Sequence, residues 1–368
     1  MISFPPPENS TGVSDKRRII EIAQTIIEAS TERIVTNYPF ENQELDNAVF
    51  SSLNRSYPKT GEFIHIVEFD QSNKSLKNID NIFKSVRYCR IGFAPVYCYS
   101  VGLGKFNSSL FPYFFLTESY GLLFNENGSD GIFTNNEDFV KQLTIAANKL
   151  SSSCEPLGAF CDNVFKIKDH FQRLSGSKTI GCFCNHMCTL PISPPEVFEA
   201  GTSDNLPNRE IFVQLVTNHY MGMRKFYDDE WHVMPEDSID DYVKNGPQYD
   251  VPKSLMNTLP NEMRRLVLQS FYDIAKDNPK AYFFADKSII NFSDPCFNIE
   301  IYGSAVCIYG SIPTSEDPFS GQYRIFVKNK NIAQDFVYCK GFLERSGLYH
   351  SGEWMLSKIS EAIESCKN

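Results

Sequence analysis

The segment Gly181-Cys-Phe-Cys-Asn-His-Met-Cys188 holds the densest set of side chains that could do chemistry. Cys182, Cys184, His186 and Cys188 offer the thiol and imidazole groups that tetrahedral zinc takes. Structural zinc sites usually pair two knuckles across a loop, whereas alternate positions along a strand would leave these side chains in a row on one face. We therefore expect buried, apolar cysteines here, with no metal and no other cofactor bound.

Recognisable catalytic frames are missing from the rest of the sequence. It contains no Gly-x-Ser-x-Gly elbow, His-Glu-x-x-His helix or Gly-x-x-x-x-Gly-Lys-Ser/Thr loop. The six histidines stand in no familiar arrangement with Ser, Cys or Asp, and the acidic runs near Asp228 and Asp240 are typical of solvated turns and helix caps. The sequence thus predicts no catalytic residue. The alternative is an enzyme of unrecognised class that uses a thiol near Cys182–Cys188.

One pattern of apolar segments occurs twice along the chain. The first copy covers Tyr113–Leu150 and the second covers Val306–Leu343. Each copy has apolar strands separated by a hydrophilic turn and closes on a short amphipathic helix. A unit used twice indicates two pseudo-repeated halves that pack around a shared core.

Strand and helix patterns alternate ahead of the first copy, which predicts an α/β fold. Glu62–Phe69 and Tyr88–Gly92 are expected to be strands, with a helix over Leu76–Val86 between them, and Trp231–Met234 is expected to be a later strand. The pattern divides the chain into an N-terminal arm with helices (1–60), a first α/β half (61–150), a cysteine-rich crossover (151–210) and a second α/β half (211–368).

Composition excludes several classes of protein. Of 368 residues 42% are apolar and 22% are charged, which is typical of a globular chain. A net charge of −10 opposes a phosphate backbone, so we expect no specific DNA binding by this chain alone. Eleven cysteines, an odd number, favour reduced thiols, and no apolar run is long enough for a membrane span. The expected location is the cytoplasm.

Several segments resemble the ligand-sensing region of Firmicute transcriptional regulators that carry a helix-turn-helix module. The segments that are similar, in order, are Phe111–Glu118, Leu122–Phe124, Pro194–Phe198, Leu206–Phe212, Gly321–Val327, Asp335-Phe336 and Phe342-Leu343. This resemblance implies a bacterial regulatory protein with an α/β effector region. Residues 1–60 contain no helix-turn-helix pattern, so the DNA-binding module would be absent or supplied by a partner.

The two-copy pattern is also similar to the halves of the phospholipase-D-like fold, which some bacterial regulators use as a degenerate effector-binding domain. Active enzymes of that fold need a His-x-Lys motif, because the histidine is the nucleophile and the lysine stabilises charge. None of the six histidines is followed two residues later by lysine. The resemblance therefore implies a fold without catalysis.

These observations favour a non-enzymatic sensor or regulatory protein that binds a small ligand or a partner protein between two α/β halves. An aromatic-lined groove would use Tyr113, Phe115, Thr117 and Arg324 as ligand-binding residues. Arg324 stands alone as a charge within an apolar strand, and a solvated arginine on a half-exposed strand is the favoured alternative for it. A homodimer, or a pure protein-interaction or inhibitor module, is also compatible with the sequence.

Overall fold

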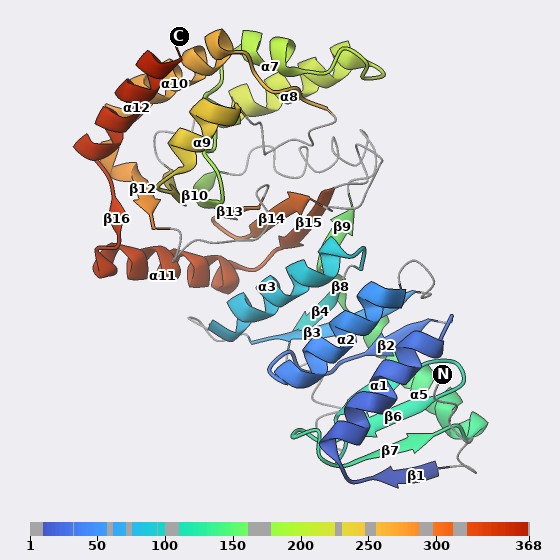
Figure 1. Ribbon diagram of the computed structural model, residues 1–368. Coiled ribbons are helices and arrows are strands. Elements are labelled where there is room, and N and C mark those ends of the chain that lie inside the picture. The colour runs from blue at the N-terminus through green and yellow to red at the C-terminus, as the bar shows by residue number, and fades with distance from the viewer. Residues whose placement is uncertain are drawn as a thin grey trace. The chain divides into compact units, whose positions relative to one another are not determined.

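The structure is a computed structural model that describes most of the chain. The described residues are 10–31, 33–56, 62–70, 76–93, 95–99, 110–160, 178–224, 230–246, 255–286, 297–311 and 322–366. The chain divides into two compact units, Met1–Gly158 and Ala159–Asn368, each of which is described here by itself. Figure 1 shows how the elements are arranged within each unit.

The first unit contains a mixed sheet with the strand order β1-β7-β6-β5-β2-β3-β4-β8. Strands β2, β3 and β4 are parallel, and the other neighbouring strands are antiparallel. The strands are β1 (Ser10–Val13), β2 (Ile34–Thr36), β3 (Phe63–Phe69), β4 (Val96–Tyr99), β5 (Tyr113–Leu116), β6 (Gly121–Phe124), β7 (Gly131–Thr134) and β8 (Glu155–Pro156). The helices are α1 (Lys16–Ala29), α2 (Gln43–Ser56), α3 (Leu76–Arg90) and α5 (Glu137–Ser152).

Helices cover both faces of this first sheet (Figure 1). On one face, Tyr88 of α3 packs against Phe63 and His65 of β3. On the other face, Ala147 and Leu150 of α5 belong to an apolar cluster with residues of β2, β3 and β5. Alternation along each strand therefore sends side chains into two separate apolar layers.

The second unit contains a mixed sheet with the strand order β16-β12-β11-β10-β13-β14-β15-β9. Strands β10, β11 and β12 are parallel, whereas β13, β14 and β15 continue the sheet as antiparallel strands. The strands are β9 (Gly158–Phe160), β10 (Thr179–Cys184), β11 (Trp231–Pro235), β12 (Tyr282–Ala285), β13 (Asn298–Tyr302), β14 (Val306–Ser311), β15 (Gln322–Val327) and β16 (Tyr349–His350). The helices are α7 (Pro195–Gly201), α8 (Arg209–Arg224), α9 (Ser238–Asn245), α10 (Asn261–Ala275), α11 (Lys330–Ser346) and α12 (Glu353–Ser365).

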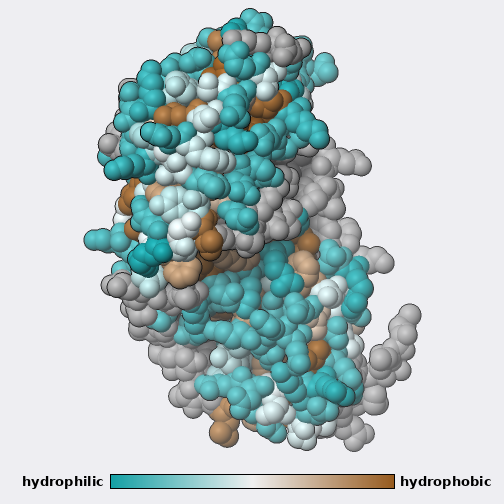
Figure 2. All heavy atoms as spheres, turned by 60° about the vertical axis from the view of Figure 1, so that its left-hand side comes forward, coloured by the Kyte–Doolittle hydropathy of each residue, from teal (hydrophilic) through white to brown (hydrophobic). Residues whose placement is uncertain are grey.

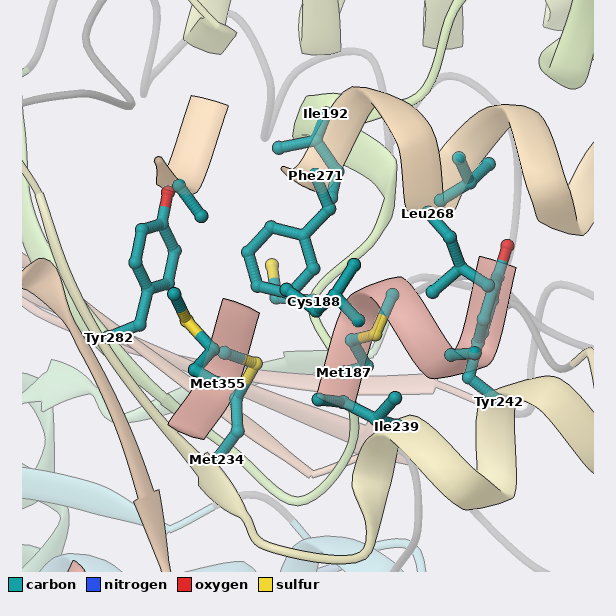
Figure 3. Packing of buried hydrophobic residues seen from close by; sticks show 14 of the residues in the cluster. Met187, Cys188, Ile192, Met234, Ile239, Tyr242, Leu268, Phe271, Tyr282 and Met355 are labelled. Atoms are coloured by element: carbon teal, nitrogen blue, oxygen red, sulfur yellow. The ribbon is translucent and has the colours of Figure 1, made fainter. Parts of the chain in front are cut away.

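Helices also cover both faces of the second sheet (Figure 1). One face packs against α9, α10 and α12, in a cluster that includes Ile239, Phe271 and Met355 (Figure 3). On the other face, Leu343 of α11 packs with Val233 and Phe283. The cysteines of β10 lie on the first of these faces.

The two sheets share one strand order and one pattern of strand directions. Each has three parallel strands, then three antiparallel strands beside the first of them, then a long helix and a short antiparallel edge strand. A mixed α/β fold in two halves, expected from the sequence, is therefore confirmed. The strand of the second unit that corresponds to β5 is β13, so the second copy begins at Asn298, one strand before the expected Val306.

Several expected boundaries differ from the observed ones. The expected strands Glu62–Phe69 and Trp231–Met234 are β3 and β11, but Tyr88–Gly92 is not a strand, because α3 continues to Arg90. The expected arm at 1–60 supplies β1 and β2 to the first sheet. The expected crossover at 151–210 supplies β10, a strand in the middle of the second sheet.

The surface seen in Figure 2 is mainly hydrophilic, with apolar side chains in small separate patches. Among the residues that the structure describes, no helix combines the length and the apolar character needed to cross a membrane.

Candidate metal centre

Cross-strand register brings thiol, imidazole, carboxamide and carboxyl groups together on one face of the second sheet. Residues that lie directly opposite each other on neighbouring strands share a face. One row across the sheet includes His232, Cys182 and Glu300, and the next row includes Cys184, Asn298, Tyr309 and Arg324. All seven residues are buried. Polar groups in such a position must find partners within the protein.

Three thiols converge at one end of this face. Cys182 and Cys184 are two residues apart on β10, and the chain turns after Cys184 so that Cys188 returns to them. The three Sγ atoms all lie within 4.8 Å of one another, and those of Cys182 and Cys184 are 3.5 Å apart. Figure 3 shows Cys188 inside the apolar cluster, next to Phe271. The row of isolated side chains expected from strand alternation is therefore not what the chain forms.

His232, rather than His186, supplies an imidazole to this group. Its Nδ1 lies 3.0 Å from Sγ of Cys182, and its ring stacks on Tyr282. The Nδ1 atom of His186 instead lies 3.1 Å from the carbonyl oxygen of Met187. Zinc bonds of about 2.3 Å to sulfur and about 2.0 Å to nitrogen place the ligand atoms of a tetrahedron roughly 3.5–3.8 Å apart. The three Sγ atoms are within 4.8 Å of one another, whereas Nδ1 of His232 is close to Cys182 alone and would have to move toward Cys184 and Cys188 to complete a tetrahedron.

The thiols do not ionise equally. Hydrogen bonds from Cys184 and Cys188 lower the pKa of Cys182 to about 7, although burial opposes this change. Burial, together with the neighbouring thiols, raises the pKa of Cys184 well above its usual range. A buried cluster can hold one thiolate if the other thiols donate to it. In the metal-free cluster, ionisation is therefore favoured at Cys182 and disfavoured at Cys184.

A hydrogen-bond chain connects the thiols to a buried carboxyl group. The single hydrogen of the Cys184 thiol can point to Sγ of Cys182, 3.5 Å away, or to Oδ1 of Asn298, 3.3 Å away. Nδ2 of Asn298 donates to the hydroxyl of Tyr309 over 2.9 Å. The hydroxyl of Tyr309 donates to Oε1 of Glu300, and that of Tyr302 donates to Oε2 over 2.6 Å. A change in protonation at Cys184 can therefore reach Glu300 through two side chains.

A second acidic group lies near Glu300. Burial raises the pKa of the Glu230 carboxyl group to about 7, and the charge of Glu300 adds to this increase. His232 lowers the same pKa, by a smaller amount than burial raises it. Two carboxyl groups that share a poorly solvated region resist simultaneous ionisation.

Arg324 is buried, with only 6% of its surface exposed, so the expectation of a solvated arginine is wrong. Its guanidinium carbon lies 5.0 Å from the centre of the Tyr309 ring, which is a cation–π distance. Burial lowers the pKa of His219 to about 3, and the charge of Arg324 adds to this effect. Arg324 is thus part of the interior of the second unit.

The other expected ligand-binding residues lie in the first unit. Tyr113 is half-buried on β5, whereas Phe115 and Thr117 are buried. The Phe115 ring stacks on Tyr38, and the Thr117 hydroxyl accepts a hydrogen bond from the Tyr120 amide over 2.9 Å. Their role in binding a ligand stays a prediction.

The first unit fills the corresponding part of its sheet with aromatic rings. In that sheet His65 lies opposite Thr36, as His232 lies opposite Cys182 in the second. Tyr38 stacks on His65, with ring centroids 4.3 Å apart, and on Phe115 at 5.3 Å. Burial lowers the pKa of His65 to about 4. At matching sheet positions, Thr36 and Phe115 of the first unit thus correspond to Cys182 and Glu300 of the second, and a histidine is present in both.

Comparisons with known proteins give only remote likenesses. No family model and no curated protein matches the chain. Similar solved structures include TrmBL2, an archaeal chromatin protein, at 9% identity and a TM-score of 0.30, over 42% of this chain and 57% of that one. Phosphatidylserine synthase from Haemophilus influenzae Rd KW20 has 8% identity and a TM-score of 0.28, over 94% and 88%. Polyphosphate kinase from Porphyromonas gingivalis has 11% identity and a TM-score of 0.29, over 89% and 49%.

Proposed function

We propose that this chain is a non-enzymatic regulatory protein whose second unit binds a soft divalent cation, with Zn²⁺ as the first candidate. The ligands would be Cys182, Cys184, Cys188 and His232. The observation that carries the proposal is the convergence of three buried thiols within 4.8 Å, with an imidazole nitrogen 3.0 Å from one of them.

The chemistry of the four groups selects the class of metal. Thiolates favour soft or borderline cations, and three thiolates with one imidazole are a common zinc set, whereas magnesium and calcium prefer oxygen ligands. Four protein ligands complete a tetrahedral shell and leave no position for a substrate or a reactive water. This ligand set therefore supports a structural or regulatory role over a catalytic one.

A thiol-dependent enzyme is the main alternative. Cys182, with its pKa near 7 and an imidazole beside it, has the chemistry of an activated nucleophile. A nucleophile must also reach its substrate, and Cys182 is only 4% exposed, inside an apolar cluster. Metal ligation uses the same thiolate without needing access for a substrate, so it fits the site better.

The hydrogen-bond chain supplies a route from the metal to the rest of the sheet. Metal binding removes the proton of Cys184, so that its sulfur can no longer donate to Oδ1 of Asn298. Rotation of the Asn298 amide would present Nδ2 to the thiolate and Oδ1 to Tyr309. The Tyr309 hydroxyl would then donate to Asn298 and leave Glu300 with one phenol donor. Occupancy of the metal site would thereby alter the Glu300 network.

Zinc titration of the full chain tests the proposal. We expect one zinc per chain by elemental analysis, and more than tenfold weaker binding after Cys184→Ser or His232→Gln. Cys339→Ser is the matched control, because Cys339 is a partly exposed cysteine on α11, and it should bind zinc like the wild type. Zinc binding that survives Cys184→Ser, or no zinc bound by the folded wild type, would overturn the metal site.

Removal of zinc separates regulation from a purely structural role. We expect the chelated protein to keep its circular dichroism spectrum and its cooperative unfolding, because the cluster already has hydrogen bonds without a metal. Zinc should then bind reversibly and change hydrogen exchange at β13 and β14. Global unfolding of the second unit on chelation would contradict the regulatory part of the proposal.

A further inference from the structure

Two cysteines of the first unit lie close to the pairing of β4 with β8: Cys98 is on β4, and Cys154 immediately precedes β8. In the pair of β4 and β8, Val96 lies opposite Pro156 and Tyr97 lies opposite Glu155. One further step in this antiparallel register places Cys98 opposite Cys154. Directly opposed antiparallel residues have Cα atoms roughly 4.5–5.5 Å apart, and a disulfide bond needs Cα atoms about 4.4–6.8 Å apart. The backbone register therefore suits a disulfide bond between them.

The side chains already meet. The two thiols are hydrogen-bonded to each other, and Cys154 also donates to the carbonyl oxygen of Leu150 over 3.3 Å. Cys98 is buried, whereas Cys154 is partly exposed at the end of α5. A reagent from solvent can thus reach Cys154 first, and the buried thiol of Cys98 can then react with the oxidised Cys154.

We propose that Cys98 and Cys154 form a reversible disulfide bond in response to hydroperoxides. The Cys154 thiolate attacks the terminal peroxide oxygen, the S–O bond forms as the O–O bond breaks, and Cys154 becomes a sulfenic acid. The departing hydroxide or alkoxide takes up the proton that the Cys154 thiol had lost and leaves as water or an alcohol. The Cys98 sulfur then attacks the Cys154 sulfur, an S–S bond forms, and the sulfenic oxygen leaves as water with the Cys98 proton. The two thiols lose two electrons and the hydroperoxide gains them.

The chemistry of the pair supports this order of attack. The hydrogen bond from Cys98 lowers the pKa of Cys154, which favours the thiolate at the more accessible sulfur. Cys89, another cysteine of the first unit, is buried on α3, and burial raises its pKa to about 12. Cys89 should therefore stay reduced under conditions that oxidise the pair.

Peroxide treatment followed by peptide mapping tests the proposal. Wild-type full chain is treated with hydrogen peroxide, alkylated, digested and analysed by mass spectrometry, with and without a final reduction step. We expect a Cys98–Cys154 cross-linked peptide about 2 Da lighter than the sum of its reduced parts. The cross-link should disappear on reduction, and it should form in Cys89→Ala as in the wild type.

Two variants make the outcome decisive. In Cys98→Ala, Cys154 should progress to sulfinic acid, because no second sulfur intercepts the sulfenic acid. In Cys154→Ser, which changes a partly exposed residue, Cys98 should stay reduced during peroxide treatment. All of it should then react with the alkylating reagent. Free Cys98 and Cys154 in the peroxide-treated wild type, or a Cys154 that oxidises to sulfinic acid as readily as in Cys98→Ala, would overturn the proposal.

Discussion

At the scale of single residues, the thiol cluster links metal binding to proton release. The pKa of Cys182 is lowered to about 7 and that of Cys184 is raised well above its usual range, so at pH 8 the metal-free cluster favours one thiolate, at Cys182. A bound zinc ion needs Cys182, Cys184 and Cys188 all deprotonated. We therefore expect zinc binding at pH 8 to release about two protons. Calorimetric titration in buffers with different ionisation enthalpies measures this number. A release near zero would mean that the thiols are not the ligands.

Glu230 gives a second prediction at this scale. The pKa of Glu230 is about 7 in the folded chain, against a usual value of 4.5. Between pH 4.5 and pH 7 the folded state therefore binds a proton that the unfolded state has released. The Glu230 carboxyl group therefore does not reduce the free energy of unfolding below about pH 4.5. The reduction grows as the pH rises and is complete above pH 7. Glu230→Gln should raise the free energy of unfolding at pH 8 by up to about 3 kcal/mol and change it little at pH 4.

Urea unfolding at the two pH values measures the effect of Glu230. Glu262→Gln is the control, because Glu262 is an exposed carboxylate in the first turn of α10, and it should change stability little at either pH. An equal gain at pH 4 and pH 8 would show that the Glu230 carboxyl does not change its protonation between them.

At the scale of elements, the close contact of β10 with β11 depends on a glycine. Gly181 lies opposite Trp231, and a Cβ atom at Gly181 would lie 2.2 Å from Cδ2 of the Trp231 ring. An indole ring packed on Phe183 cannot move aside easily. Gly181→Ala should therefore reduce the free energy of unfolding by about 1–3 kcal/mol, as is usual for overpacked sites. Chemical denaturation measures the change.

Gly12→Ala is the matched control for this substitution. Gly12 is also in a strand, β1, but no atom lies within 4 Å of a Cβ atom added there. Gly12→Ala should change stability by less than about 0.5 kcal/mol. Equal effects of the two substitutions would mean that the contact with Trp231 does not restrict residue 181.

Element patterns predicted part of the fold. Alternating apolar residues located β3 and β11, and the Tyr113 segment was correctly expected to be a strand. Tyr88 and Cys89 were expected to lie in a strand because they are apolar, but both belong to α3. Tertiary packing holds them there, and the Tyr88 hydroxyl donates a hydrogen bond to Oδ1 of Asp46. The second copy was expected to begin at Val306, one strand too late. Strands β13, β14 and β15 all have similar apolar patterns, so spacing alone could not show which of them corresponds to β5.

The candidate site was harder to predict than the fold. His232 and Cys182 are far apart in the sequence, and only the register of β10 with β11 places them opposite each other. The turn after Cys184 that returns Cys188 to the cluster leaves no spacing signature of a paired knuckle. The expectation of no metal was based on the absence of paired knuckles and on strand alternation, and it stays a prediction. Strand alternation describes Cys182 and Cys184 but not Cys188.

At the scale of the whole molecule, one strand order serves two different interiors. The first unit places Thr36, His65 and Phe115 where the second unit places Cys182, His232 and Glu300. Burying a thiol or a carboxyl group reduces stability unless the group is hydrogen-bonded or paired. The thiol of Cys182 and the carboxyl group of Glu300 have no counterpart at the matching positions of the first unit, which supports a function located in the second.

The central claim is that Cys182, Cys184, Cys188 and His232 bind zinc together, and X-ray absorption at the zinc edge tests it most directly. The full chain is loaded with one equivalent of Zn²⁺ and compared with Cys184→Ser. The account predicts a first shell of three sulfur atoms at about 2.3 Å and one nitrogen atom at about 2.0 Å in the wild type, with fewer sulfur atoms in the variant. A wild-type shell of oxygen and nitrogen atoms only would contradict it.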